Sequence, residues 1–407
     1  MSSIEEIRRE FPQLSEKVYG KPLVYLDNAA TSLRPRSVIA KWDEMSSRFS
    51  ANLHRAVHAV SERATEEFEA ARAETAKFIG ASSPKEIIFT SGATQALNML
   101  AFCLGERKAF LKIGDEIVIG EAEHHSNILP WQFLSERKNL KIKVLPVDER
   151  GALRTEELQR VITDRTRLIC ISQVSNVLGL VNPVRQIADY CHSKGVLVVV
   201  DGAQGIVHCK TNVKELSADF YAFSGHKLYA APGTGVLWGR KSLLETLPPY
   251  MGGGEMVGTV KWEGSTFAPV PHKFEAGTQN MAGVPTLIPA YKWVRKFDEY
   301  PELEGVKRYM LEALKEIPGL RLFGVPESYE EKVPLFSFAV EGAHHEDLAL
   351  ILDKMGIAVR SGQMCAEPLM DRYGVTGMVR ASFTHYNTQE EAEYFIKSLN
   401  KAIKMLK

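Results

Sequence analysis

Two residues of complementary chemistry stand at the ends of apolar runs in the middle of the chain. Asp201 directly follows the run VLVVV, and Lys227 follows DFYAFSGH. Such runs are typical of strands buried on both faces of a parallel sheet, whose carboxyl ends form the ligand-binding edge. A lysine at that edge can form a Schiff base, and a carboxylate there can pair with a protonated ring nitrogen. The pair therefore predicts an enzyme that uses pyridoxal 5′-phosphate.

The ordinary alternatives are a solvated lysine and an aspartate that only starts an Asp-Gly turn. A strand-end crevice would instead desolvate Lys227 and lower its pKa, which favours the neutral, nucleophilic amine. Ser224 and His226, in the segment SGHK, supply a hydroxyl and an imidazole that suit a phosphate group. Gln204 lies one short turn after Asp201 and Asn176 lies at another strand end, where each could bond the phenolic oxygen of the cofactor.

A second candidate phosphate site lies in EIIFTSGATQALNMLAF, which reads as a strand, a tight turn and a helix. Free backbone amides at the helix start, around Ser91 to Gln95, attract anions. Many unrelated turns share this pattern, so it supports a phosphate site only in combination with the other candidate cofactor residues. His124 and His125 follow a further apolar run, and no third ligand at metal spacing accompanies them. We expect no metal site, and an imidazole stacked on the cofactor and available for proton transfer.

Cys365 lies in a polar loop, RSGQMCAEPLMDRYG, with Arg360 before it and Arg380 after it. Nearby guanidinium groups favour the thiolate, the nucleophilic form of cysteine. We expect the two arginines to bind a substrate carboxylate, although a surface ion pair is the alternative. Burial as small apolar side chains is expected for the remaining cysteines, Cys103, Cys170, Cys191 and Cys209.

Charge and composition narrow the choice of partner. Fifty basic and fifty acidic residues in a chain of 407 give a formal net charge of zero, which argues against nucleic acid or an anionic membrane surface. The cysteines form no CxxC pair, as expected for a reduced chain. The charged N-terminus has no signal-peptide core, and no apolar run approaches the ~20 residues of a membrane span. We expect a cytoplasmic protein whose partners are small molecules and proteins.

Apolar runs alternate with helix-length segments along most of the chain, which predicts βαβ units and a largely parallel sheet. The predicted strands are VYL at 24, EIIFT at 86, EIVI at 116, IKVLPV at 142, LICIS at 168, VLVVV at 196, DFYAF at 219 and GVLW at 235. After Gly283 the pattern becomes that of an α+β domain. We expect an N-terminal arm over residues 1–22 that packs on the small domain, a large cofactor-binding domain over 23–290 and a small domain over 291–407 that carries the cysteine loop.

The motifs together resemble the class V aminotransferase family of fold-type I pyridoxal phosphate enzymes, and more narrowly the SufS-type (group II) cysteine desulfurases and selenocysteine lyases. The resemblance covers nearly the whole chain, in order and spacing. It rests on YLDNAATS at 25, TSGATQALN at 90, EAEHHSNILPW at 121, VVVDGAQ at 198, SGHKLYAAPGTGVLWG at 224, GGGEM at 252, FEAGTQN at 274 and RSGQMCAEPLMDRYG at 360. It implies an α/β fold: a mostly parallel seven-stranded sheet sandwiched by helices, with a smaller C-terminal α+β domain.

The resemblance also implies a role for each matching residue. Lys227 corresponds to the Schiff-base lysine, Asp201 to the partner of the ring nitrogen and His124 to the stacking group. The phosphate contacts correspond to Thr94, Ser224 and His226, with Thr278 reaching in from the second subunit of a homodimer. Asn176 and Gln204 correspond to the contacts of the phenolic oxygen, Arg380 to the carboxylate clamp and Cys365 to the nucleophile that takes the sulfur.

The activity implied is conversion of L-cysteine to L-alanine with a persulfide on Cys365, for delivery to an acceptor or scaffold protein of iron–sulfur cluster assembly. A selenocysteine lyase, or another pyridoxal phosphate lyase or hydrolase of the family, is the alternative. One departure from the family pattern lies beside the nucleophile. Gln363 and Met364 stand where the family usually has two histidines.

Overall fold

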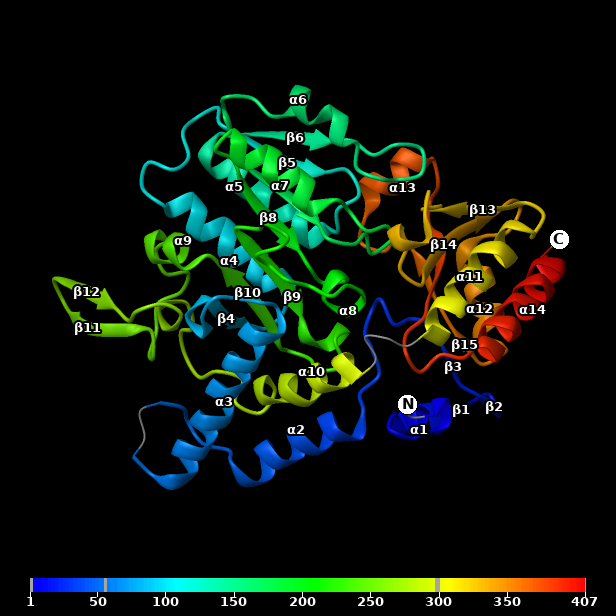
Figure 1. Cartoon of the computed structure of the whole chain (residues 1–407), viewed down its shortest axis with the longest axis horizontal. Helices are drawn as coiled ribbons and strands as arrows, with labels where there is room; N and C mark the ends of the chain where they lie inside the picture. The colour runs from blue at the N-terminus through cyan, green and yellow to red at the C-terminus, as the bar shows by residue number, and fades with distance from the viewer. Residues whose placement is uncertain (1–2, 55–56, 297–300, 407) are drawn as a thin grey trace.

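The computed structural model describes residues 3–54, 57–296 and 301–406. A seven-stranded sheet runs through the larger part of the chain (Figure 1), in the order β4-β10-β9-β8-β7-β5-β6. Strand β10 is antiparallel to β4 and β9, and the remaining pairs are parallel. The predicted fold class is thereby confirmed. The strands are β4 (Ile87–Thr90), β5 (Glu116–Gly120), β6 (Lys141–Leu145), β7 (Thr166–Ser172), β8 (Leu197–Asp201), β9 (Phe220–Ser224) and β10 (Gly235–Gly239).

Both faces of this sheet are covered, which explains why its central strands are apolar throughout. In β8, Val198 and Val200 point into one hydrophobic cluster, whereas Val199 points into another on the opposite face. Helices α3, α7 and α10 contribute to the first cluster, and α4, α5 and α9 to the second. The helices of this part are α2 (Arg36–Arg48), α3 (Ala59–Phe78), α4 (Ala93–Glu106), α5 (Leu129–Lys138), α6 (Leu158–Val161), α7 (Val184–Ser193), α8 (Gly205–His208), α9 (Lys241–Thr246) and α10 (Leu287–Lys296).

A second, antiparallel sheet of four strands follows, in the order β13-β14-β17-β16. Helices α11, α12 and α14 build a separate hydrophobic cluster with it. A capping box opens α14, because Thr388 and Glu391 each accept a hydrogen bond from the other's backbone N–H. The elements are α11 (Pro301–Lys315), β13 (Leu320–Phe323), β14 (Leu335–Val340), α12 (His345–Lys354), β15 (Ile357–Ala358), β16 (Arg360–Gly362), α13 (Glu367–Tyr373), β17 (Met378–Ser382) and α14 (Gln389–Leu406).

One predicted strand belongs elsewhere. The apolar run at Val24 does not join the large sheet, but forms the short strand β3 (Val24–Tyr25), which pairs in parallel with β15. Val24 and Leu26 are buried in the hydrophobic cluster of the four-stranded sheet. A run of three apolar residues carries no information about which of two sheets will cover it.

The N-terminal segment comprises α1 (Ile4–Arg9) and the small hairpin of β1 (Lys17–Val18) and β2 (Lys21–Pro22). Its anchor is Phe11, which is 2% exposed. The Phe11 ring lies 4.6 Å from that of Tyr386, near the C-terminus, but also 5.8 Å from that of Tyr229 and 5.6 Å from that of Trp293. The arm thus contacts residues on both sides of the expected domain boundary, and not the small domain alone.

A two-stranded hairpin, β11 (Val257–Lys261) and β12 (Gly264–Phe267), extends away from the rest of the chain (Figure 1). It exposes apolar side chains, among them Val260, Trp262 and Phe267. Exposed apolar surface of this kind is typical of an interaction site. Among the described residues, no helix is both long and apolar enough to cross a bilayer.

Phe11→Ala should lower the free energy of unfolding by about 3–5 kcal/mol, because it leaves a cavity among three aromatic rings. Urea denaturation followed by circular dichroism measures this change. Phe133→Ala is the matched control, since Phe133 is 58% exposed, and it should change the value by less than about 0.5 kcal/mol. Equal effects of the two substitutions would show that Phe11 does not anchor the arm.

Candidate active site

A cavity of about 260 Å³ opens where the carboxyl ends of the large sheet meet the four-stranded sheet. It collects every predicted site residue except Thr278, although they come from segments far apart in the sequence. Its lining includes Thr94, His124, Asn176, Asp201, Gln204, Ser224, His226, Lys227, Arg360, Cys365 and Arg380. Residues with the chemistry for a cofactor, a substrate carboxylate and a sulfur nucleophile therefore share one cavity.

The ends of three neighbouring strands supply the floor of the cavity. Ser172, Asp201 and Ser224 are the last residues of β7, β8 and β9, and Ser172 pairs with Asp201 in register. Lys227 follows in the 3-10 turn Gly225–Lys227. Because parallel strands end at one edge of a sheet, side chains that are separate in sequence become neighbours there.

Asp201 is buried, and Lys227 is half-buried in the same cavity. Burial raises the pKa of Asp201, and the positive charge of Lys227 opposes that rise. Burial likewise lowers the pKa of Lys227, against the attraction of Asp201. Lys227 Nζ donates no hydrogen bond to any described residue. A desolvated lysine of lowered pKa is more often neutral, and its amine is then a nucleophile.

His124 precedes the 3-10 turn His125–Asn127, and its ring Nδ1 accepts a hydrogen bond from the backbone N–H of Ser126 at 3.0 Å. This bond leaves the proton of the neutral ring on Nε2. Burial, with the nearby charges of Lys227 and Arg380, lowers the pKa of His124 to about 3. The imidazole is therefore neutral at physiological pH and presents one N–H donor.

The start of helix α4 meets Ser224 across the cavity wall. The backbone N–H of Ala93 donates to Ser224 Oγ at 2.8 Å, and Thr94 Oγ1 lies 2.7 Å from Ser126 Oγ. The first turn of α4 can come this close because β10 begins with Gly235. A Cβ at Gly235 would lie 2.3 Å from the Cα of Gly92. Hydroxyl groups and a helix start suit a phosphate group at this side.

The segment Tyr25–Ser32 closes another side. Gln204 Nε2 donates to the carbonyl oxygen of Ala29 at 2.8 Å, and the carbonyl oxygen of His226 accepts from the backbone N–H of Ser32 at 3.1 Å. Burial, together with Lys227, lowers the pKa of His226 to about 4. The ring of His226 is thus a neutral hydrogen-bonding group and not a fixed cation.

Arg380, in the middle of β17, is 3% exposed and points into the cavity. Its Nη1 donates to the carbonyl oxygen of Asn176 at 2.8 Å and its Nη2 to Asp27 Oδ1 at 3.3 Å, while Nε is buried with no partner among the described residues. Arg360 is more exposed, and its Nη1 lies 3.9 Å from Asp27 Oδ2. A buried guanidinium with an unused N–H is ready to bind a carboxylate.

Cys365 lies between β16 and α13 and is exposed at the cavity rim. The preceding residues have opposite environments: Gln363 is exposed, whereas Met364 is 6% exposed and packs in the core. Asn176 Nδ2 donates to the carbonyl oxygen of Met364 at 2.9 Å, which joins the loop to the segment after β7. The sulfur therefore faces the cavity that Lys227 and Arg380 also line.

Thr278 is exposed and lies outside this cavity, so it cannot contact a cofactor bound in the cavity of its own chain.

Sequence reasoning also missed two residues. Asp27 binds both arginines, and its position inside the quoted motif YLDNAATS was the available signal. Glu123, 1% exposed, accepts hydrogen bonds from Ser172 and Asn127, and its burial raises its pKa to about 8.

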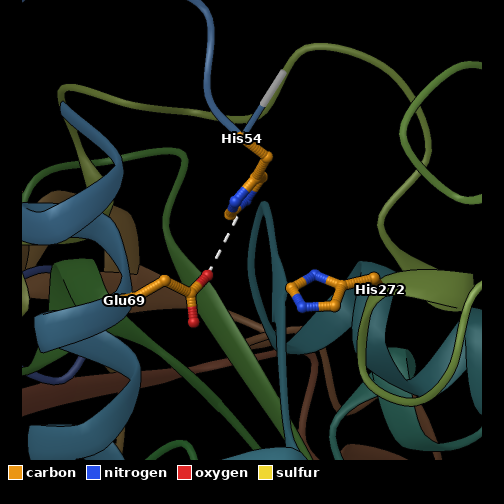
Figure 2. A group of neighbouring side chains, drawn as sticks. All are labelled: His54, Glu69 and His272. Carbon is orange, nitrogen blue, oxygen red and sulfur yellow. Dashed lines mark ion pairs between the residues drawn. The ribbon is translucent and has the colours of Figure 1, made fainter. Parts of the chain in front are cut away.

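One cluster of possible metal ligands lies elsewhere in the described part of the chain (Figure 2). Ligand atoms of His54, Glu69 and His272 lie within 4.8 Å of one another. Two imidazoles and a carboxylate can bind zinc. Both Glu69 oxygens already accept hydrogen bonds from Arg72, however, at 2.9 and 3.1 Å. This guanidinium supplies the positive charge that a metal would bring, so we interpret the cluster as an ion-paired surface of α3.

The depressed pKa of His124 predicts a pH-dependent stability. Between its ordinary pKa of 6.5 and about 3 only the unfolded state binds the proton, so this contribution is complete above pH 6.5 and is lost as the pH falls. From pH 8 to pH 5, the free energy of unfolding of the cofactor-free protein should fall by about 2 kcal/mol more than that of His124→Asn. Denaturant titrations at both pH values measure the difference, and parallel curves would refute the assignment.

Comparisons with known proteins agree with this geometry. The family model described as aminotransferase class V matches residues 24–395. A protein of Yersinia pseudotuberculosis named cysteine desulfurase is 42% identical over 99% of both chains.

Two solved structures share the whole fold. The cysteine desulfurase CsdA from Escherichia coli, in its S-sulfonic acid form, has a TM-score of 0.90 at 37% identity, covering 100% of this chain and 99% of the other. The apo structure of a cysteine desulfurase from Thermococcus onnurineus has a TM-score of 0.93 at 35% identity, with the same coverage. By sequence match, fold and cavity, the chain belongs to the aminotransferase class V family.

Proposed function

We propose that the protein is a pyridoxal phosphate-dependent cysteine desulfurase that converts L-cysteine to L-alanine and leaves the sulfur on Cys365 as a persulfide. Members of this family use pyridoxal 5′-phosphate, and the full-length relatives named above are cysteine desulfurases. One observation carries the proposal for this chain. Cys365 lines the same cavity as Lys227, Asp201 and Arg380.

The cavity residues fit the cofactor. The buried Asp201 carboxylate suits a protonated ring nitrogen, because its own burial calls for a positive partner. Thr94, Ser224 and His226 would offer donors to the phosphate group, and Gln204 and Asn176, which line the same cavity, would offer amides to the phenolic oxygen. When bound, the cofactor withdraws electrons from the substrate and stabilises the negative charge left by loss of the α-proton.

Lys227 and His124 have separate roles in the proposed reaction. Lys227 would hold the cofactor covalently, and its lowered pKa allows the same amine to accept the α-proton of the substrate. His124 remains neutral with its proton on Nε2, so it can stack on an aromatic ring without placing a positive charge there. The separation of roles follows from burial, which disfavours the charged form of both groups.

Arg380 would bind the substrate carboxylate. Its buried guanidinium lines the cavity, and a hydrogen bond between charged groups is stronger than a neutral one. Arg360 extends the positive rim. Asp27 holds both guanidinium groups and sets their direction.

The Cys365 thiolate would attack the sulfur of the bound cysteine. An S–S bond forms and the substrate C–S bond breaks, and the electron pair of that bond stays on carbon. This carbon takes up a proton and becomes the methyl group of alanine. The atoms and electrons balance with no external oxidant, because the cysteine sulfur is transferred and the carbon is reduced.

We also propose a homodimer and an acceptor protein of iron–sulfur cluster assembly. The apolar hairpin β11–β12 and the surface position of Thr278 support a second copy that brings Thr278 to the neighbouring cavity. The exposure of Cys365 at the rim supports delivery to a protein. All five cysteines are free, which supports a reducing compartment such as the cytoplasm.

Cys365→Ser should lower alanine formation from L-cysteine by more than about a thousandfold while the yellow cofactor absorbance persists, because the nucleophile alone is lost. Alanine and persulfide are quantified by mass spectrometry, with Cys209→Ser as the matched control. Lys227→Ala should remove the borohydride-fixable cofactor. Persulfide formation by Cys365→Ser would contradict the proposed nucleophile.

Thr278→Ala tests the dimer by subunit complementation. The homodimeric variant should bind the cofactor about tenfold more weakly, the effect of losing one hydrogen bond to a charged group. Heterodimers of Thr278→Ala with Lys227→Ala should regain one site of wild-type affinity, since the intact threonine then faces the intact lysine across the interface. Tandem affinity tags isolate the heterodimer, and absence of any wild-type site would place Thr278 outside the partner's cavity.

A further inference from the structure

His125, the second residue of the histidine pair, contacts the nucleophile loop twice. Its backbone N–H donates to the carbonyl oxygen of Cys365 at 2.8 Å. Its ring Nε2 accepts a hydrogen bond from the backbone N–H of Glu367 at 3.2 Å. Neither contact was expected from the sequence, where 242 residues separate His125 from Glu367. The imidazole therefore bonds the chain immediately beyond the nucleophile.

The loop needs such contacts because its backbone is strained. Met364 and Cys365 have φ angles of +54° and +56°, in the left-handed region that residues with a Cβ rarely adopt. Each such residue raises the free energy of the loop, so neighbouring groups must hold it in place. Asn176 contributes its bond to the Met364 carbonyl oxygen. With those of His125, three hydrogen bonds from the segments after β5 and β7 hold residues 364–367.

We propose that His125 is a positioning residue, whose ring bond to Glu367 keeps the Cys365 loop closed over the cavity. This inference rests on the proposed function. In that reaction Cys365 must face into the cavity to attack the substrate sulfur, and must face outward to pass the sulfur to an acceptor. Of the three hydrogen bonds, the one to the His125 ring is the bond that we expect to break and re-form. Its side chain is 31% exposed, so water competes for Nε2 and the closed state is held only weakly.

The two residues that precede Cys365 carry no imidazole. In this chain neither Gln363 nor Met364 brings an imidazole next to Cys365, and Met364 is instead packed into the core. His125 supplies an imidazole to the loop from the opposite wall. The alternative explanation is that His125 acts through an ion pair with the Glu367 carboxylate, whose Oε2 lies 3.9 Å from Nε2. If the ion pair were responsible, Glu367→Gln would loosen the loop as much as His125→Ala does, although Glu367→Gln keeps the backbone N–H.

Hydrogen exchange of the holoenzyme tests the loop without reference to turnover. In His125→Ala, exchange of the peptide that contains the Glu367 amide should accelerate about fivefold, as expected for loss of one capping bond. His125→Gln should restore slow exchange, because Gln Oε1 reaches about as far as Nε2 and accepts the same bond. Glu367→Gln should leave exchange unchanged. His344→Ala is the matched control: His344 Nδ1 also accepts from a backbone N–H, that of Glu346, at 3.4 Å in α12.

Steady-state kinetics gives the second readout. In His125→Ala, kcat should fall between about fivefold and a hundredfold, because attack depends on placement of the thiolate. KM and the spectral change on adding L-cysteine should stay within about twofold of the wild-type values, because Arg380 and Lys227 are unchanged. His125→Gln should recover most of kcat, and His344→Ala should match the wild type.

Unchanged exchange in His125→Ala, or no rescue of exchange by His125→Gln, would overturn the positioning role. If His125→Ala does not fold, His125→Asn replaces it, because its shorter amide cannot reach Glu367, and the same comparison with His125→Gln decides. A wild type that forms no alanine would instead refute the proposed function. The exchange data would then still report whether His125 holds the loop.

Discussion

A carboxylate buried at the end of the central strand is the constraint on which this site depends. Asp201 is 6% exposed, and burial raises its pKa although Lys227 pulls it down. An isolated buried charge is costly, so the surroundings must provide a cation. Within the chain, the charged form of Lys227 opposes the rise of the Asp201 pKa, and the protonated ring nitrogen of the cofactor would be the further positive partner. The same burial makes Lys227 a better nucleophile, so one environment prepares both groups.

The second requirement of the proposed function is to bring Cys365 and Arg380 to this point from a different sheet. Arg380 lies within β17, and its bonds to Asn176 and Asp27 cross to segments that the large sheet and its N-terminal extension support. Asn176 in turn bonds the carbonyl oxygen of Met364. One residue thus connects the two: the backbone carbonyl of Asn176 bonds Arg380, and its side-chain amide bonds the loop that carries Cys365.

The sequence predicts the part of the site that local pattern controls. Asp201, Ser224 and Lys227 follow long apolar runs. In an α/β fold, a run buried on both faces belongs to the interior of the parallel sheet. The short run at Val24 has no such constraint, and it pairs with β15 instead. The contacts of His125 and Asp27 depend on chain segments more than 200 residues away, which no local periodicity encodes. Thr278 is a different case, because its expected partner lies on another chain.

The contrast between the two halves of the site has a physical reason. The groups proposed to bind the cofactor lie at strand ends and a helix start, where the surrounding core holds them rigidly, as a fixed electron-withdrawing ring would require. Cys365 instead lies on a strained loop held by a few hydrogen bonds, one of them partly open to water. In the proposed reaction Cys365 receives sulfur inside the cavity and gives it up outside, so a rigid core could not hold this residue throughout. Weak contacts such as the one from His125 would allow the loop two positions of similar free energy.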